Sequence, residues 1–365
     1  MAAIGNTLPG RYYAATEIFQ QELERIFYQQ WLCAGREEQI PEPGDYLVRT
    51  VGAESLILVR GRDGAARAFY NVCRHRGTRI CTNPSGHFRE TIQCRYHAWT
   101  YGLDGQLLGA PLMNENHDFR KQNYPLYSVP LESWEGFLFV NLAPEPEPFA
   151  AAFAPLIGKF RAWHIPKLRE AHRIQYDLTA NWKLLFENYS ECYHCPLIHP
   201  DLVRLSPYRS GRNDLVEGPF LGGSMDINEG LDSMSMSGGR CAPPLGEVSG
   251  IDLQRVYYYS IFPNMLLTLH PDYVMYHLMQ PQGANRTLVE CVWLFDPEAM
   301  AHPHFDPGSA VEFWDLTNRQ DWEMCELTQS GVGSRAYTAG PYSPMESLLA
   351  AFDREVLRVL GHAPV

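Results

Sequence analysis

Residues 73–81 read Cys-Arg-His-Arg-Gly-Thr-Arg-Ile-Cys and residues 94–101 read Cys-Arg-Tyr-His-Ala-Trp-Thr-Tyr. Each stretch begins with a cysteine that a histidine follows two or three positions later. Two thiolates and two imidazoles suit a tetrahedral zinc ion, or a [2Fe–2S] cluster in which two histidines bind one iron and two cysteines the other. Zinc sites with mixed ligands usually place both cysteines before both histidines, whereas the two residue types alternate here. The pattern favours the cluster, and its predicted ligands are Cys73, His75, Cys94 and His97.

Short β-type runs surround the two stretches. Residues 46–59 contain apolar runs typical of strands, and the Asp-Gly pairs at 63–64 and 104–105 indicate hairpin turns. Residues 36–142 are therefore predicted to form a small antiparallel β domain. The proline-rich segment at 144–148 indicates a domain boundary.

The remaining residues, 1–35 and 143–365, are predicted to form an α+β domain with an antiparallel sheet. Periodicity predicts helices at 16–31, 181–194, 311–329 and 344–360, and strands at 171–178, 257–265, 273–280 and 287–295. Residues 206–250 are rich in Gly, Ser and Met and have weak periodicity. Such a segment is typical of a mobile loop over a site, or of disorder.

A second group of metal-binding residue types lies at 191–199, which read Glu-Cys-Tyr-His-Cys-Pro-Leu-Ile-His. On a helix, Glu191 and His194 would share one face, because they are three residues apart. His199 would point roughly 140° away from His194 if the helix continued. Pro196 should end or bend the helix, so that His199 can return towards His194. Two imidazoles and one carboxylate form the facial triad that binds Fe(II) and leaves positions open for O2.

The two cysteine-histidine stretches resemble the cluster-binding loops of Rieske non-haem iron oxygenases. Residues 191–199 resemble the mononuclear iron motif of the same family, a carboxylate followed by His after two residues and by a second His after four more. The resemblance implies that His194 and His199 bind iron. It also implies that Glu191 is not a ligand, but joins the iron histidine to a cluster histidine, His97 of the partner subunit. Most members of the family carry Asp at this position, so Glu191 departs from the pattern.

The third iron ligand in this family is an acid on the first C-terminal helix. Residues 318–323 and 337–343 resemble that region, and Asp321 aligns with the ligand. Asp315 and Glu323 are the competing acids.

Together, the two motifs resemble the oxygenase (alpha) subunit, in which a Rieske β domain is inserted in a helix-grip catalytic domain. The resemblance implies a homotrimer that uses O2 and takes electrons from a separate NAD(P)H-dependent flavin or ferredoxin reductase. This chain has no Gly-x-Gly-x-x-Gly run and no plant-type ferredoxin cysteine run, so those functions are expected on another protein.

The substrate implied by the resemblance is a small quaternary ammonium compound such as a betaine, which would be hydroxylated or lose a methyl group as formaldehyde. The chain has 20 Tyr and 17 Phe, from which a cation-binding cage could be built. The candidates for the pocket are Tyr208, Tyr259, Phe262 and His277. The alternative within the family is hydroxylation or demethylation of an aromatic compound. Outside the enzyme class, the alternatives are a non-catalytic Rieske electron carrier and a structural zinc protein.

Composition excludes several other classes. The 30 Lys and Arg against 42 Asp and Glu give a net charge of −12, which argues against a nucleic-acid partner. No apolar run of about 18 residues predicts a membrane-spanning helix, and residues 1–11 lack the pattern of a signal peptide. Of the nine cysteines, Cys73 and Cys94 are predicted cluster ligands, and no signal pairs the remaining seven, so free thiols in a cytoplasmic protein are expected.

Overall fold

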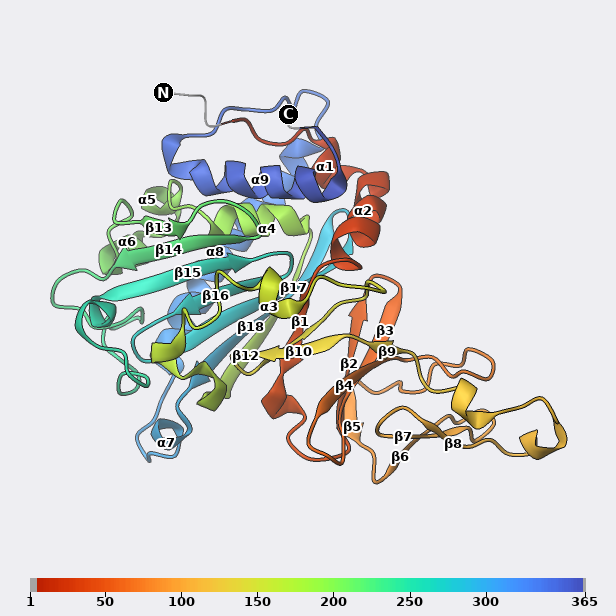
Figure 1. Cartoon of the computed structure of the whole chain (residues 1–365). Coiled ribbons are helices and arrows are strands. Elements are labelled where there is room, and N and C mark those ends of the chain that lie inside the picture. Colours follow the sequence, from red (N-terminus) through yellow and green to blue (C-terminus); the bar gives the residue numbers. More distant parts are fainter. Residues whose placement is uncertain (1–4, 364–365) are drawn as a thin grey trace. The chain divides into compact units, whose positions relative to one another are not determined.

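The computed structural model describes residues 5–363 and divides into two compact units (Figure 1). One unit contains residues 27–149, where the sequence predicts a domain at 36–142. The other contains residues 5–26 and 150–363. The small unit is therefore an insertion in the sequence of the large one.

The small unit consists of short antiparallel strands in three sheets. Their orders are β5-β2-β3-β4-β9, β6-β7-β8 and β1-β11-β10. The strands are β1 (Leu32–Arg36), β2 (Asp45–Val51), β3 (Glu54–Arg60), β4 (Ala66–Tyr70), β5 (Ser85–His87), β6 (Thr91–Gln93), β7 (Thr100–Gly102), β8 (Leu107–Gly109), β9 (Ser128–Val129), β10 (Leu131–Trp134) and β11 (Phe137–Val140). Both predicted Asp-Gly turns are confirmed, since Gly64 and Gly105 have φ angles of 80° and 83° and lie between β3 and β4 and between β7 and β8.

The large unit is built on one antiparallel sheet of seven strands in the order β12-β18-β17-β16-β15-β14-β13. The strands are β12 (Arg169–Leu178), β13 (Arg212–Leu215), β14 (Phe220–Asp226), β15 (Arg255–Ile261), β16 (Met265–Leu269), β17 (Val274–Gly283) and β18 (Arg286–Phe295). The helices are α1 (Arg11–Ala14), α2 (Thr16–Glu22), α3 (Phe149–Ala152), α4 (Trp182–Tyr189), α5 (Cys195–Ile198), α6 (Pro200–Leu205), α7 (Pro297–Met300), α8 (Gly308–Val332) and α9 (Ser347–Leu360). Helix α4 contacts α8, α9 and strand β17, so it links the helices to the sheet (Figure 1). The predicted α+β class with antiparallel sheets is confirmed.

Four predicted elements of the large unit differ from the structure. The strand predicted at 257–265 is β15 and the turn after it, which leads into a separate strand, β16. The helix predicted at 16–31 is α2 followed by a π-helical turn at Leu23–Phe27. The helix predicted at 181–194 is α4, which ends at Tyr189. The prediction of a mobile or disordered segment at 206–250 is wrong, because this segment supplies β13 and β14 of the central sheet.

The rest of that segment is held by a buried carboxylate. Asp272, which is fully buried, accepts hydrogen bonds from the hydroxyl of Ser233 and from the backbone N–H of Cys241, the second at 2.7 Å. Met234 is also fully buried, and its carbonyl accepts a 2.6 Å hydrogen bond from the Tyr273 hydroxyl. A weakly periodic sequence is therefore ordered by contacts with residues far along the chain.

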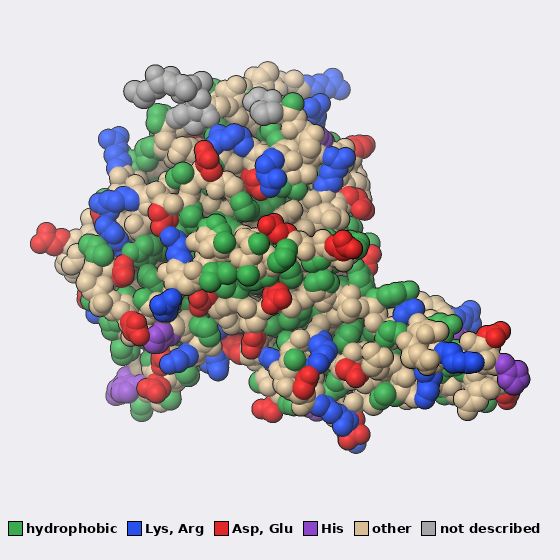
Figure 2. All heavy atoms as spheres, viewed as in Figure 1, with side chains coloured by type: hydrophobic (Ala, Val, Ile, Leu, Met, Phe, Trp, Pro, Cys, Tyr) green, Lys and Arg blue, Asp and Glu red, His purple; other side chains and the backbone are tan. Residues whose placement is uncertain are grey.

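The surface does not concentrate charge of one sign on the face seen in Figure 2, where acidic and basic side chains are interspersed among the described residues. No helix in the described range 5–363 combines the length and the apolar character needed to cross a bilayer.

Candidate metal centres

The two predicted cluster loops of the small unit have the same backbone hydrogen bonds. The N–H of Cys73 donates to the carbonyl of Thr78, and the N–H of Gly77 donates to the carbonyl of Cys73, both at 2.9 Å. In the second loop, the N–H of Cys94 donates to the Trp99 carbonyl at 2.9 Å, and the N–H of Ala98 donates to the Cys94 carbonyl at 3.1 Å. Each cysteine therefore begins a tight loop of the same size, with its histidine inside it.

Each loop also turns through a left-handed residue at the same position, four after the cysteine. Gly77 has a φ angle of 73° and Ala98 has one of 53°. In the sequence, a glycine also follows each pair of predicted ligands, at 77 and at 102, and this predicts a tight turn at both positions. The structure confirms the turn at Gly77 and contradicts it at Gly102. Gly102 lies in β7, and a Cβ there would come within 2.5 Å of the Asp104 carboxylate. Gly102 therefore lies outside the turn, and Ala98 carries the left-handed φ angle of the second loop.

The four predicted ligands of the small unit form two pairs. The His75 and His97 rings are 4.7 Å apart between centroids, and His75 stacks on Trp99 at 4.9 Å. Burial raises the pKa of the Cys94 thiol, and the adjacent Cys73 thiol raises it further. The four ligand atoms do not all lie close together. Among the described residues, the group of three or more metal-binding side chains with all ligand atoms within 4.8 Å of one another lies in the large unit. A single tetrahedral ion would draw all four atoms together, so this arrangement fits a two-iron cluster better than zinc.

Two further contacts support this fit. The Nδ1 atom of His75 is buried and has no hydrogen-bond partner in the described chain, as expected for an atom that binds metal. The hydroxyl of Tyr101 accepts a 3.1 Å hydrogen bond from the N–H of Arg74, and therefore can donate its own hydrogen to the Cys73 sulfur at 3.3 Å. His97 is exposed, so this side of the loops faces solvent in the single chain.

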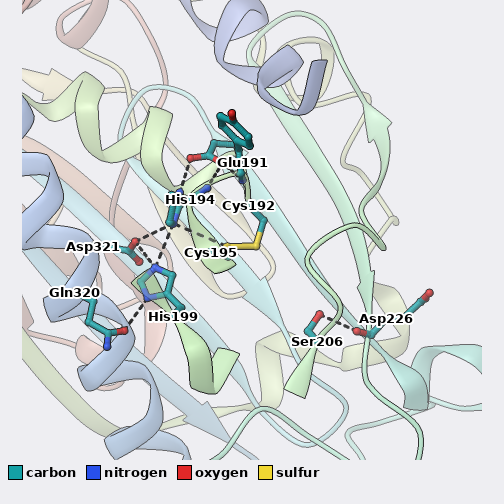
Figure 3. The surroundings of a disulfide bond; sticks show 10 residues. Glu191, Cys192, His194, Cys195, His199, Ser206, Asp226, Gln320 and Asp321 are labelled. Atoms are coloured by element: carbon teal, nitrogen blue, oxygen red, sulfur yellow. Dashed lines mark hydrogen bonds and ion pairs between the residues drawn. A yellow bond between two sulfur atoms is a disulfide. The ribbon is translucent and has the colours of Figure 1, made fainter. Parts of the chain in front are cut away.

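The second centre lies in the large unit, where three predicted ligands converge (Figure 3). The Nε2 atoms of His194 and His199 are 3.2 Å apart, and the Asp321 Oδ1 atom is 3.3 Å from the first and 2.7 Å from the second. Ligand atoms at right angles around an iron with bonds of about 2.1 Å lie about 3.0 Å apart. The three side chains therefore fit one face of an octahedral metal ion.

The competing acids do not reach this point. Asp315 accepts a 2.8 Å hydrogen bond from the Tyr176 hydroxyl and pairs with Arg319 at 2.9 Å. Glu323 is exposed on α8. Asp321 is thus the acid that the structure places beside the two histidines.

The segment that carries the histidines is a turn followed by two short helices. The sequence places Glu191 and His194 on one helical face, but helix α4 has ended before them. Instead, the Glu191 carboxylate accepts hydrogen bonds from the backbone N–H groups of Tyr193 and His194 and from the Nδ1 atom of His194. The predicted return of His199 is confirmed, because α5 and the break at His199 bring its ring back to His194.

Hydrogen bonds to the far side of each ring orient both histidines. The Nδ1–H of His194 donates to Glu191, and the Nδ1–H of His199 donates to the Gln320 amide oxygen at 2.7 Å. In each ring this leaves the Nε2 lone pair free for a metal. Gln320 is a site residue that sequence reasoning missed, although its position directly before Asp321 on α8 was a signal.

Electrostatics at this centre favour metal binding. Burial lowers the pKa of His194, but the hydrogen bonds and charges of Asp321 and Glu191 outweigh burial and raise it to about 10. Burial raises the pKa of Asp321, but hydrogen bonds and charges from the two histidines outweigh burial and lower it. The lowered pKa keeps Asp321 ionised, and its negative charge favours a positive charge beside it, either a proton on a histidine or a metal ion.

The expectation that the seven cysteines outside the predicted cluster are unpaired is wrong at one place. Cys192 and Cys195 form a disulfide that spans Tyr193 and His194 (Figure 3). The other described cysteines are free, and six of those seven are buried. Spacing alone was a weak signal, since the same Cys-x-x-Cys pattern also occurs in metal-binding sites.

A cavity of about 630 Å³ opens beside the three converging ligands. Five aromatic side chains line it: Tyr189, Tyr208, Tyr258, Trp314 and Trp322. Of the predicted pocket residues, Tyr208 and His277 line the cavity, whereas Tyr259 and Phe262 do not. Arg209 is its one Lys or Arg side chain among the described residues, and its guanidinium lies 5.3 Å from the ring centre of Tyr208.

Comparison with known proteins agrees with both centres. Residues 30–130 match the Rieske [2Fe-2S] domain family, and residues 165–362 match the ring hydroxylating alpha subunit (catalytic domain) family. The glycine betaine monooxygenase oxygenase subunit of Pseudomonas aeruginosa is 30% identical over 92% of this chain and 85% of its own. The carnitine monooxygenase oxygenase subunit of Escherichia coli K12 is 36% identical over 55% of each chain.

Solved structures show the same architecture. The quaternary ammonium Rieske monooxygenase CntA in complex with L-carnitine superposes with a TM-score of 0.79 at 25% identity, over 98% of this chain and 96% of that one. Naphthalene 1,2-dioxygenase from Rhodococcus has the same fold, with a TM-score of 0.79 at 20% identity over 97% of this chain and 94% of that one. The zinc and electron-carrier alternatives are therefore excluded. The chain belongs to the Rieske oxygenases, as an oxygenase subunit that carries a Rieske [2Fe–2S] domain and a mononuclear iron catalytic domain.

Proposed function

We propose that this oxygenase subunit oxidises a small quaternary ammonium compound that also carries a carboxylate, and that it removes an N-methyl group. The observation that carries the proposal is the convergence of His194, His199 and Asp321 at the wall of an aromatic cavity. Cys73, His75, Cys94 and His97 are the proposed cluster ligands. When bound, the cluster supplies electrons and the iron supplies O2 activation.

The cavity walls suit a quaternary ammonium group. Such a group has no hydrogen to donate, so aromatic faces are its best partners, and Tyr208, Tyr258 and Trp314 are available. The relatives named for glycine betaine and carnitine act on compounds of this class.

Arg209 is the proposed partner of the substrate carboxylate. Its side chain is exposed, and in the described chain it has no carboxylate partner. Its guanidinium is therefore available to bind a substrate carboxylate by paired hydrogen bonds. We infer that a betaine is held with its ammonium group among the aromatic rings and its carboxylate at Arg209.

The proposed reaction inserts one oxygen atom into a C–H bond of the N-methyl group. The second oxygen atom leaves as water after two electrons and two protons are supplied. The N-hydroxymethyl product then breaks its C–N bond, so that formaldehyde and a protonated amine with one methyl fewer are released. Glu191, Gln320 and Asp321 hold the histidine rings in place throughout, and Glu191 is the proposed link to His97 of the partner subunit.

We also propose the partners and setting of the reaction. A separate NAD(P)H-dependent reductase supplies the electrons, and three copies form a head-to-tail ring, so that electrons cross between subunits. A cytoplasmic location fits the five described cysteines that are neither proposed cluster ligands nor part of the disulfide.

The test is turnover with a panel of substrates in the presence of a purified flavin-type reductase, NADH and O2. Glycine betaine, carnitine, choline and benzoate are compared by formaldehyde release and by mass spectrometry of products. O2 uptake alone is not scored, because it also occurs without product formation. Formaldehyde from the betaines supports the proposal, whereas a hydroxylated benzoate and no formaldehyde would favour the aromatic alternative.

A further inference from the structure

The disulfide of the large unit lies directly against a proposed iron ligand. The Cys195 sulfur is 4.0 Å from the His194 Nε2 atom, which is the atom that faces Asp321 and His199. In Figure 3, Asp321 and the disulfide lie on opposite sides of His194. Both cysteines also line the 630 Å³ cavity.

The disulfide closes a short loop of the chain that contains His194. Cys192 and Cys195 are three residues apart, with Cα atoms 5.0 Å apart, and the segment between them is neither helix nor strand. On the other side of this segment, Glu191 accepts both backbone N–H groups and the Nδ1–H of His194. His194 is therefore held by the disulfide, which joins Cys192 to Cys195, and by Glu191, which binds Tyr193 and His194 between them.

The position of the pair makes it the best target for an oxidant released in the cavity. Four of the other thiols are protected by burial, which raises the pKa of Cys241 to about 11, that of Cys81 to about 12, and those of Cys291 and Cys325 well above the ordinary value. Thiols with a raised pKa are poor nucleophiles and react slowly with peroxide. None of these four lines the cavity.

We propose that Cys192 and Cys195 form a reversible oxidation site, closed by hydrogen peroxide and opened by a dithiol reductant, whose closed form retains the mononuclear metal more firmly. Hydrogen peroxide oxidises one thiol to a sulfenic acid and releases water. The second thiol attacks the sulfenic sulfur, the S–S bond forms, and a second water leaves. In total, two thiols lose two electrons and two protons, and both oxygen atoms of the peroxide are reduced to water.

The source of peroxide is the chemistry of the cavity itself. Reduction of O2 by two electrons and two protons, without oxidation of substrate, yields hydrogen peroxide beside this pair. In the closed form the Cys195 sulfur lies 4.0 Å from a ligand atom, so a thiol released by opening the bond can compete for the metal, and the loop loses one constraint. The inference about metal retention rests on the proposed role of His194 as an iron ligand, whereas the inference about thiol oxidation does not.

The first test maps thiols in the holoprotein. The protein is reduced with dithiothreitol, exposed to increasing hydrogen peroxide, quenched and alkylated, and each cysteine is scored by mass spectrometry. We expect Cys192 and Cys195 to lose alkylation together, to give a peptide two hydrogens lighter, and to recover with dithiothreitol. Cys241, which is partly buried and outside the cavity, is the internal control. Oxidation of Cys241 at the same peroxide dose, or conversion of the pair to sulfinic acids instead of a disulfide, would overturn the proposal.

The second test measures metal retention. Oxidised protein, reduced protein and the Cys192→Ser/Cys195→Ser variant are challenged with an iron chelator, while visible absorption follows the cluster separately. We expect about tenfold faster loss of non-cluster iron from the reduced protein and the double variant, and no change for Cys241→Ser. Equal rates would overturn the role of the bond in metal retention. Absence of non-cluster iron from every form would overturn the proposed ligands as well, while leaving the thiol result valid.

Discussion

Each iron histidine uses one ring nitrogen for orientation and keeps the other for the metal. For His194 the orienting partner is Glu191, and for His199 it is Gln320. A Glu at position 191 reaches the ring from outside the helix, through a turn that it builds with its own carboxylate. Glu191 is longer than the Asp that most members of the family carry, and its carboxylate shapes the turn by binding backbone N–H groups while it still contacts the iron histidine.

Removal of Asp321 should cost the chain its mononuclear metal and leave the cluster intact. In Asp321→Ala, we expect iron to fall from about three to about two atoms per chain, because the facial triad loses its anionic ligand. Metal analysis with visible spectroscopy measures both sites. Glu323→Ala, on the exposed side of the same helix, is the matched control, and normal iron content in Asp321→Ala would contradict the assignment.

Removal of the Tyr101 hydroxyl should lower the reduction potential of the cluster. The hydrogen bond from Tyr101 to the Cys73 sulfur stabilises the more negative, reduced cluster, so Tyr101→Phe makes reduction less favourable. Redox titration followed by visible absorption measures the change. Tyr96→Phe serves as a control, because Tyr96 is exposed. An unchanged potential would show that the Tyr101 hydroxyl does not act on the sulfur.

Arg209 should distinguish substrates with a carboxylate from those without one. In Arg209→Gln, we expect kcat/KM for betaines to fall roughly tenfold, since a hydrogen bond between two charged groups is lost. Turnover of choline, which has no carboxylate, should stay the same. An equal loss for both substrates would place Arg209 outside the substrate site.

At the scale of elements, the iron segment shows why local periodicity misjudged a helix. The sequence predicts a helix to 194, but the Glu191 carboxylate binds the N–H groups that would continue it. A side chain that competes for backbone donors ends a helix that apolar spacing alone would extend. For the weakly periodic segment after 206, the error has the opposite direction: the sequence predicts mobility or disorder where the structure is ordered. Asp272 and the neighbouring strands order this segment.

The packing of α1, α4 and α9 depends on buried carboxyl groups. Glu187 on α4 accepts a 2.8 Å hydrogen bond from the Tyr13 hydroxyl, and Asp353 on α9 accepts one from the Tyr342 hydroxyl, also at 2.8 Å. Burial raises the pKa of Asp353 to about 7 and that of Glu187 well above its ordinary value. These acids are therefore favoured in their protonated form in the folded protein.

The free energy of unfolding should fall as pH rises through this range. A carboxyl group whose pKa is higher in the folded state stabilises the fold below its unfolded pKa of about 3.9, and this contribution is lost as pH rises to about 7. We expect a loss of up to about 4 kcal/mol between these limits, and a smaller loss in Asp353→Asn. Urea denaturation at pH 5 and pH 8 measures the part of this loss that lies above pH 5, which is about 3 kcal/mol. Asp177→Asn, at an exposed carboxylate paired with Arg286, should keep the pH dependence of the parent protein over this range.

At the scale of the whole molecule, the proposed ring places the cluster of one subunit beside the iron of the next. Subunits that lack the cluster (His97→Ala) and subunits that lack the iron (His199→Ala) should each be inactive alone. When co-expressed, they should form mixed oligomers that regain formaldehyde release, because intact sites then meet across a subunit boundary.

Mass spectrometry of the intact oligomers confirms that mixing has taken place, and light scattering gives the number of subunits. Inactive mixed oligomers would mean that electrons stay within one subunit. Mixtures assembled from two variants of the iron site, such as His199→Ala with Asp321→Ala, provide the inactive control.

The sequence by itself predicted the two-unit plan, the cluster loops and the pair of iron histidines. These features depend on residues close together in the chain, so that spacing and residue type carry the chemistry. The family resemblance pointed to Asp321 as the third ligand, and the tertiary structure places it, rather than Asp315, beside the histidines. Only the tertiary structure showed that Gln320 orients His199 from 121 positions away. It also decided the aromatic cavity, because packing of distant elements determines which side chains meet there, whereas the local Cys-x-x-Cys spacing left open whether Cys192 and Cys195 form a disulfide or bind a metal.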